Sequence, residues 1–203
     1  MILRVIGMTL LLTVGGCATS PPNNVNDICS VFRQKKGWYD AAADSRDKWG
    51  SPIAVMMAMM HQESTFQAKA KPPRKKIFGL IPGPRPSNAY GYSQALDSTW
   101  KNYKRSAGRY GADRDDFNDA IDFIGWYNDQ SSRRSKISKS DAYNLYLAYH
   151  EGQGGFNRKT YRSKKWLIKV AKKVKGQSKK YQSQLNGCEK SLKKKRGIFG
   201  LFG

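Results

Sequence analysis

One carboxylate, Glu63, stands where a proton donor for catalysis is expected. Ile53, Met56, Met57 and Met60 recur at the spacing of one face of an α-helix. One further step of three residues reaches Glu63, which places its carboxyl group on the buried face at the end of the helix. Burial disfavours the charged form and raises the pKa of a carboxyl group, which suits a general acid at neutral pH. Periodicity alone leaves an alternative open, in which the helix frays and Glu63 caps it or faces water.

Three short motifs follow in order along the chain. They read Glu63-Ser64-Thr65-Phe66, then Ala89-Tyr90-Gly91-Tyr92-Ser93-Gln94, then Ala148-Tyr149-His150-Glu151-Gly152. Together they resemble the SLT domain of the lytic transglycosylases, in the lysozyme-like superfamily that includes goose-type lysozyme. The resemblance covers roughly residues 45–160 and implies a mostly α-helical, lysozyme-like domain. Asn88 stands where the family has glycine, and His150-Glu151 where it has Asn-Ala, which indicates a divergent branch.

The resemblance implies cleavage of the MurNAc–GlcNAc β-1,4 bond of peptidoglycan by a single glutamate. Glu63 would protonate the glycosidic oxygen and later act as the base. The substrate's own N-acetyl oxygen and then its 6-hydroxyl would attack, which leaves 1,6-anhydro-MurNAc ends. Such substrate-assisted reactions depart from the scheme of two carboxylates. No cofactor is expected.

By position in the motifs, the resemblance assigns roles to four further residues. Tyr149 would steer the catalytic carboxyl group and line the cleft, and Gln94 would reach toward the substrate. Ser64 would form a hydrogen bond nearby, and Gly91 would let the backbone approach the sugar. Without the family, Tyr149 is equally well a core aromatic residue and Gln94 a residue on a helix surface.

Two other functions stay open. If Glu151 or Asp97 faces Glu63 across a cleft, a hydrolytic muramidase becomes possible. The chain is alternatively a non-catalytic, cationic lipoprotein that binds the cell wall or a membrane. No metal site is expected, because His61 and His150 are the only two histidines and their spacing is not that of a zinc site.

The N-terminus is typical of an exported protein. Residues 1–16 contain Arg4 followed by a short apolar run, which indicates a signal peptide. The ending Leu12-Thr13-Val14-Gly15-Gly16-Cys17 resembles the lipobox of bacterial lipoproteins and implies acylation of Cys17. Residues 17–26 then form a predicted flexible tether. We expect a periplasmic, lipid-anchored protein, in the outer membrane since Ala18 is not Asp.

Export leaves two further cysteines, Cys29 and Cys188. An even number of cysteines in an oxidising compartment favours one disulfide between them, and two free thiols are the alternative.

The length of 203 residues fits one domain, which we place at 27–190, followed by a basic and apolar tail at 191–203. Helices are expected over 27–50, from Ile53 onward, and over 117–129, 141–151 and 166–174. The segment 69–90 contains five prolines and should be a long loop.

The net charge of +22 indicates an anionic partner. Residues 157–203 carry sixteen Lys and Arg and one acid. This part is a solvated tail, a surface for anionic lipid or lipopolysaccharide, or a nucleic-acid surface. Export argues against nucleic acid, so we expect peptidoglycan strands, a membrane and anionic lipid as partners, and a monomer.

Overall fold

The computed structural model describes residues 20–74, 76–78 and 80–199 and is mostly helical, which confirms the predicted fold class. The helices are α1 (Ile28–Gln34), α2 (Trp38–Trp49), α3 (Ile53–Ser64), α4 (Asp97–Ser106), α5 (Phe117–Ser135), α6 (Ala142–Asn157) and α7 (Lys165–Phe199), with a short 3-10 helix at Thr160–Ser163. The strands β1 (Lys76–Ile77) and β2 (Ile81–Pro82) pair antiparallel.

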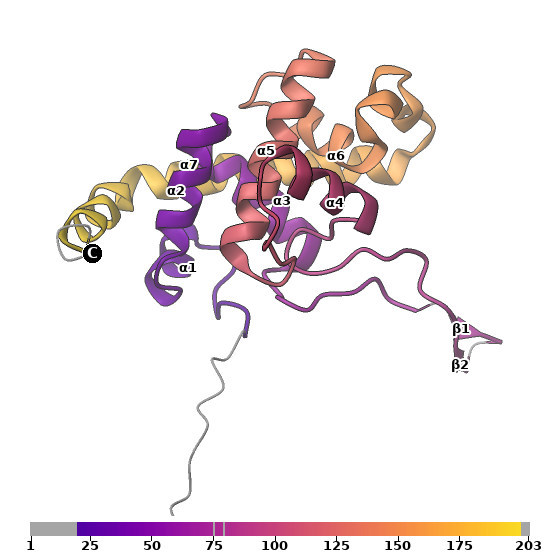
Figure 1. Cartoon of the computed structure of the whole chain (residues 1–203), viewed down its shortest axis with the longest axis horizontal. Coiled ribbons are helices and arrows are strands. Elements are labelled where there is room, and N and C mark those ends of the chain that lie inside the picture. The colour runs from indigo at the N-terminus through magenta and orange to yellow at the C-terminus, as the bar shows by residue number, and fades with distance from the viewer. Residues whose placement is uncertain (1–19, 75, 79, 200–203) are drawn as a thin grey trace, which may run out of the picture.

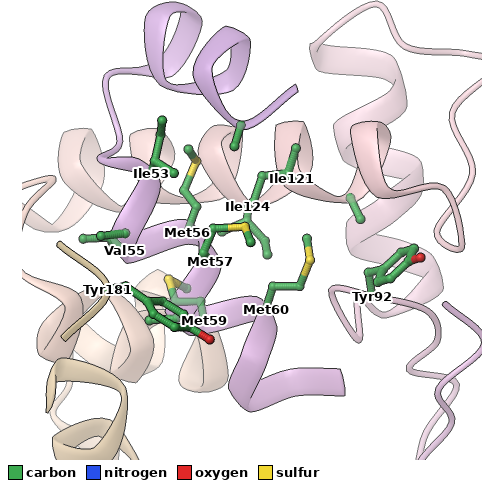
Figure 2. Packing of buried hydrophobic residues seen from close by; sticks show 14 of the residues in the cluster. Ile53, Val55, Met56, Met57, Met59, Met60, Tyr92, Ile121, Ile124 and Tyr181 are labelled. Atoms are coloured by element: carbon green, nitrogen blue, oxygen red, sulfur yellow. The ribbon is translucent and has the colours of Figure 1, made fainter. Parts of the chain in front are cut away.

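Helix α3 lies in the centre of the molecule. Every side chain from Ile53 to Met60 is at most 3% exposed, so this part of the helix is buried on all sides. Helix α7 packs along α3 and α6, and α5 packs against α2 and α6. Figure 2 shows Met56 and Met57 facing Ile121 and Ile124 of α5, while Met59 lies beside Tyr181 of α7. The end of α3, which carries Glu63, is therefore held by neighbours on several sides.

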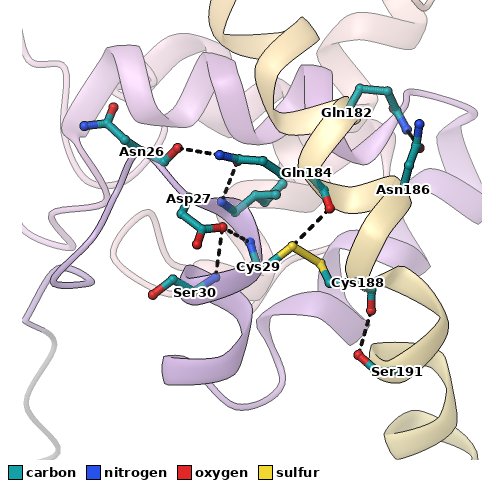
Figure 3. Close-up of a disulfide and its surroundings, with 10 residues drawn as sticks. Asn26, Asp27, Cys29, Ser30, Gln182, Gln184, Asn186, Cys188 and Ser191 are labelled. Atoms are coloured by element: carbon teal, nitrogen blue, oxygen red, sulfur yellow. Dashed lines mark hydrogen bonds between the residues drawn. A yellow bond between two sulfur atoms is a disulfide. The ribbon is translucent and has the colours of Figure 1, made fainter.

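A disulfide joins Cys29 of α1 to Cys188 of α7, across a sequence separation of 159 residues (Figure 3). Asp27 caps α1 by accepting hydrogen bonds from the backbone N–H groups of Cys29 and Ser30, at 2.9 and 3.3 Å. Gln184 accepts a hydrogen bond from the N–H of Ile28 and donates one to the carbonyl of Asn26. The two ends of the domain are thus fixed to each other.

Removal of this disulfide is expected to lower the free energy of unfolding by about 2–5 kcal/mol. The bond closes a long loop, and long loops lose the most chain entropy in the unfolded state when they are closed. Denaturant unfolding of the wild type with and without reductant measures the difference. The Cys29→Ala/Cys188→Ala variant is the control, and its stability should not respond to the reductant. Equal stability of the wild type under both conditions would contradict this expectation.

The structure differs from the sequence analysis at both ends of the domain. Helix α7 continues far beyond residue 174, because buried residues persist at helical spacing to Leu185 and Leu192. Most of the expected tail at 191–203 therefore continues the helix, up to Phe199. Residues 22–26, in the second half of the expected flexible tether, pack against the domain. Pro22 is buried, and the hydroxyl of Tyr181 donates a hydrogen bond to the carbonyl of Val25.

The described residues of the Pro-rich segment 69–90, all but 75 and 79, form no helix, and the short hairpin in this segment was not expected. Lys76 lies opposite Pro82 and Ile77 opposite Ile81. Figure 1 shows β1 and β2 at the end of a long projection, well separated from the helices. None of the helices in the described part of the chain combines the length and apolar character needed to cross a membrane.

Candidate active site

Glu63 lies in the last turn of α3, directly before a sharp change in chain direction. The helix ends at Thr65, whose N–H donates a hydrogen bond to the carbonyl of His61. Thr65 and Phe66 both have left-handed backbone conformations, with φ of 51° and 59°. Such conformations are costly for residues other than glycine and persist where the surroundings enforce them. Here Phe66 is fully buried and holds the turn against the core.

The carboxyl group of Glu63 lies deep among protein atoms, although the residue as a whole is half-buried. Burial raises its pKa from the ordinary 4.5 to about 7, and a hydrogen bond with the Tyr146 side chain lowers the pKa only in part. This agrees with the raised pKa expected from the position of Glu63 on the apolar stripe. At neutral pH a large share of the group is protonated, as a general acid requires.

Two tyrosines of α6 lie beside Glu63. Tyr146 is the hydrogen-bonding partner, and burial together with the charge of Glu63 raises the pKa of both Tyr146 and Tyr149. The hydroxyl of Tyr149 donates to the carbonyl of Ser93 at 2.6 Å. Tyr149 is thus close to Glu63 as expected, but the hydroxyl that bonds the carboxyl group belongs to Tyr146. Sequence analysis missed Tyr146, although it lies three residues before Tyr149 on the same helix face.

The second motif forms a tight loop that Gln94 holds in place. Its side-chain nitrogen donates hydrogen bonds to the carbonyls of Ala70 and Gly91, both at 2.9 Å. These bonds use both amide hydrogens, so the carbonyl oxygen is the group left to reach a substrate. Ser93 of the same loop is fully buried, and its hydroxyl has no hydrogen-bond partner among the described residues.

Gly91 is required where two backbone segments pack closely, and the expected approach of its backbone to a sugar stays a prediction. Its φ is 77°, and a Cβ atom would lie 2.0 Å from the carbonyl oxygen of Arg114. Its N–H donates to Ala70, and the next N–H, of Tyr92, donates to Arg114. Glycine is therefore needed for the close packing of two backbone segments.

We expect Gly91→Ala to destabilise the domain by about 2–5 kcal/mol, because left-handed strain and a clash with backbone atoms add together. The matched control is Gly108→Ala, which also has a positive φ, 66°, but open space at the Cβ position. Thermal or denaturant unfolding measures both variants. Similar losses in the two variants would show that the contact with Arg114 is not the cause.

Two further motif residues, Ser64 and Gly152, have roles in the local backbone structure. The hydroxyl of Ser64 donates to the carbonyl of Met60 at 3.2 Å, within α3. Gly152, the last residue of the third motif, has φ 70° and ψ 156°, a conformation close to exclusive to glycine, and interrupts α6.

The two carboxylates considered as second catalytic groups are held in ion pairs. Glu151 bonds Lys164 at 2.7 Å, and Thr160 and His150 also contact it. Although burial opposes the change, these partners lower the pKa of Glu151 to about 2. Asp97 pairs with Arg114 at 2.7 Å.

A polar and aromatic pocket of about 250 Å³ lies next to the tyrosines. Residues of α4, α5 and α6 line it: Ser98, Thr99, Asn102, Trp126, Tyr127, Gln130, Arg134 and Gln153. Tyr127 connects it to the site, since its ring centre is 5.0 Å from that of Tyr149. Amides, hydroxyls and aromatic rings are groups that suit a sugar. Within the described residues, no group of three or more His, Cys, Asp or Glu side chains is placed to hold a metal ion.

Helical architecture, a glutamate of raised pKa at the end of a buried helix, and flanking tyrosines define a lysozyme-like protein. A family model described as the transglycosylase SLT domain matches residues 5–188, so the chain belongs to this family. The lytic transglycosylases act on peptidoglycan, and the family predicted from the three motifs is confirmed. Comparisons with curated proteins and with solved structures find no match.

Proposed function

We propose that the protein cleaves the MurNAc–GlcNAc β-1,4 bond of peptidoglycan and leaves 1,6-anhydro-MurNAc ends. The observation that carries this proposal is the carboxyl group of Glu63, whose pKa is raised to about 7 by burial at the turn of the first motif. A glycosidic oxygen is a poor leaving group, so the departing sugar needs a proton from such an acid.

The proposed reaction uses Glu63 twice. The protonated carboxyl group gives its hydrogen to the glycosidic oxygen as the bond to the anomeric carbon breaks, while the substrate's N-acetyl oxygen bonds that carbon. The carboxylate then takes the proton of the 6-hydroxyl as this oxygen displaces the N-acetyl oxygen. Tyr146 stabilises the carboxylate between the two steps through its hydrogen bond.

The partners of Glu151 support this reaction over hydrolysis, because they lower its pKa to about 2 and so weak a base is poorly suited to take a proton from water. Asp97 is engaged in an ion pair with Arg114. Digestion of purified sacculi in water labelled with heavy oxygen distinguishes the transglycosylase reaction from hydrolysis. A transglycosylase yields anhydro ends without the heavy oxygen, because no water enters the product. Reducing ends that carry the label would favour the muramidase.

We also propose that the chain is exported and anchored in the outer membrane through acyl chains on Cys17. The support is the sequence of residues 1–17, which lie outside the described residues. We expect labelled palmitate to be incorporated into the wild type and not into Cys17→Ala, which should also leave the membrane fraction. Equal labelling of the two proteins would contradict the anchor.

The outer face of α7 supports an anionic partner such as lipopolysaccharide or anionic lipid. Leu167, Val174 and Leu185 of this helix are buried in the domain, whereas Trp166 near its start is exposed. Among the side chains described, up to residue 193, nine lysines of the helix are exposed: Lys165, Lys169, Lys172, Lys173, Lys175, Lys179, Lys180, Lys190 and Lys193. Binding through these lysines would be electrostatic and sensitive to salt.

A further inference from the structure

Residues 71–88 form a projection that we call the arm. Both of its ends are fixed at its base, where the carbonyl of Ala70 accepts hydrogen bonds from the N–H of Gly91 at 3.0 Å and from Gln94 at 2.9 Å. From there the arm extends away from the helices to the hairpin of β1 and β2 (Figure 1). Five prolines fix φ at their own positions and favour extended backbone, which is typical of a semi-rigid spacer.

The tip of the arm is apolar and exposed. Phe78 is 93% exposed, Leu80 85% and Ile81 60%. These are three of the six large apolar side chains that are exposed in the described part of the chain, and all three lie within positions 78–81. Single exposed apolar residues are ordinary, but a cluster at the end of a projection indicates an interaction surface.

The stem behind this tip is basic. Lys71, Arg74, Lys76 and Arg85 are exposed, and the segment 69–90 contains no acidic residue. An apolar tip followed by cations matches the acyl and phosphate layers of an anionic membrane, in that order.

The same composition recurs at the end of the chain. Ile77-Phe78-Gly79-Leu80 follows a run of basic residues, and Ile198-Phe199-Gly200-Leu201 follows Lys193 to Arg196. Two segments far apart in the sequence therefore combine the same apolar group with the same charge. A lipid bilayer, which recognises apolar and basic composition, accounts for both segments.

We propose that the arm inserts Phe78, Leu80 and Ile81 into the interface of a bilayer that contains anionic lipid. This contact is separate from the acyl anchor and from the chemistry at Glu63. It holds the domain at a second point on the membrane, with the base of the arm next to Gln94 of the candidate site.

Photo-crosslinking tests the proposal on the full chain. Benzoyl-phenylalanine replaces Phe78 in one protein and Tyr110 in the control, since Tyr110 is a loop aromatic that is 70% exposed on the body of the domain. Each protein is reconstituted with vesicles of phosphatidylglycerol and phosphatidylcholine, or of phosphatidylcholine alone. We expect phospholipid adducts at position 78 at about tenfold the yield at position 110, and a severalfold lower yield without phosphatidylglycerol. Equal yields at the two positions, or adducts with a second copy or another protein, would overturn the proposal.

The Phe78→Asp/Leu80→Asp variant separates this proposal from the proposed function. It should lose the contact between the arm and the bilayer, while the acyl anchor remains. It should still cleave soluble glycan fragments at a rate within about twofold of the wild type, because the tip is remote from Glu63. A large loss of cleavage would instead show that the arm forms part of the glycan cleft, and the membrane proposal would fail. Inactivity of the wild type toward glycan would leave the crosslinking result unaffected.

Discussion

Replacement of Glu63 by glutamine is expected to reduce glycan cleavage by at least about 10³-fold and to leave the fold intact. Glutamine keeps the size of the side chain and its capacity to bond Tyr146, but its amide is not acidic and cannot protonate the leaving oxygen. The proposed reaction has no other acid for the leaving oxygen, so the loss falls at the upper end of the range for general acid catalysis. Release of soluble muropeptides from sacculi measures the rate.

The matched control for this variant is Glu151→Gln. Glu151 belongs to the third motif, but it bonds Lys164 and contacts Thr160 and His150. Loss of these contacts should lower stability and leave the cleavage rate of the folded protein within about threefold of the wild type. Equal losses of cleavage rate in the two variants would contradict the role of Glu63 as the general acid.

Stability should depend on pH through Glu63. The pKa of this group is about 7 in the folded protein and ordinarily 4.5, so the folded state holds the proton more tightly. The stabilisation is fully present below pH 4.5 and is lost as pH rises through about 7. Glu63→Gln removes this dependence. It should therefore be more stable than the wild type by up to about 3 kcal/mol above neutral pH, and this difference should be absent in acid.

Denaturant unfolding of both proteins at pH 4 and pH 8 measures this difference. Tyr146→Phe provides a second check, because its hydrogen bond favours the charged form of Glu63. Its removal should raise the pKa of Glu63 and move the alkaline loss of activity to higher pH. Tyr149→Phe is the control, because its hydroxyl bonds Ser93. Equal stability of wild type and Glu63→Gln at pH 8 would contradict a buried carboxyl group of raised pKa.

Local sequence patterns predicted the parts of the site that depend on chain order. The apolar stripe of α3 placed Glu63 at a buried helix end, and motif order placed Tyr149 and the second motif near it. Local patterns could not predict contacts between segments that are far apart in the sequence. The requirement for Gly91 comes from the backbone of Arg114, and the bond from Tyr146 to Glu63 depends on how α6 packs against α3.

At the two ends of the domain, too, the structure depends on contacts that local sequence patterns do not predict. The lysines of α7 obscured a long apolar stripe that is evident only against its partner helices. The segment around Val25 has the composition of a linker, and it is ordered because Tyr181 and Gln184 of α7 supply hydrogen bonds to its backbone. Composition therefore predicted flexibility where a neighbouring helix supplies the missing contacts.

The most direct test of the central claim is mass analysis of the muropeptides released from sacculi by the wild type and by Glu63→Gln. We predict products with anhydro ends, lighter by one water than reducing ends, from the wild type and almost none from the variant. Anhydro products from Glu63→Gln at the wild-type rate would contradict the account.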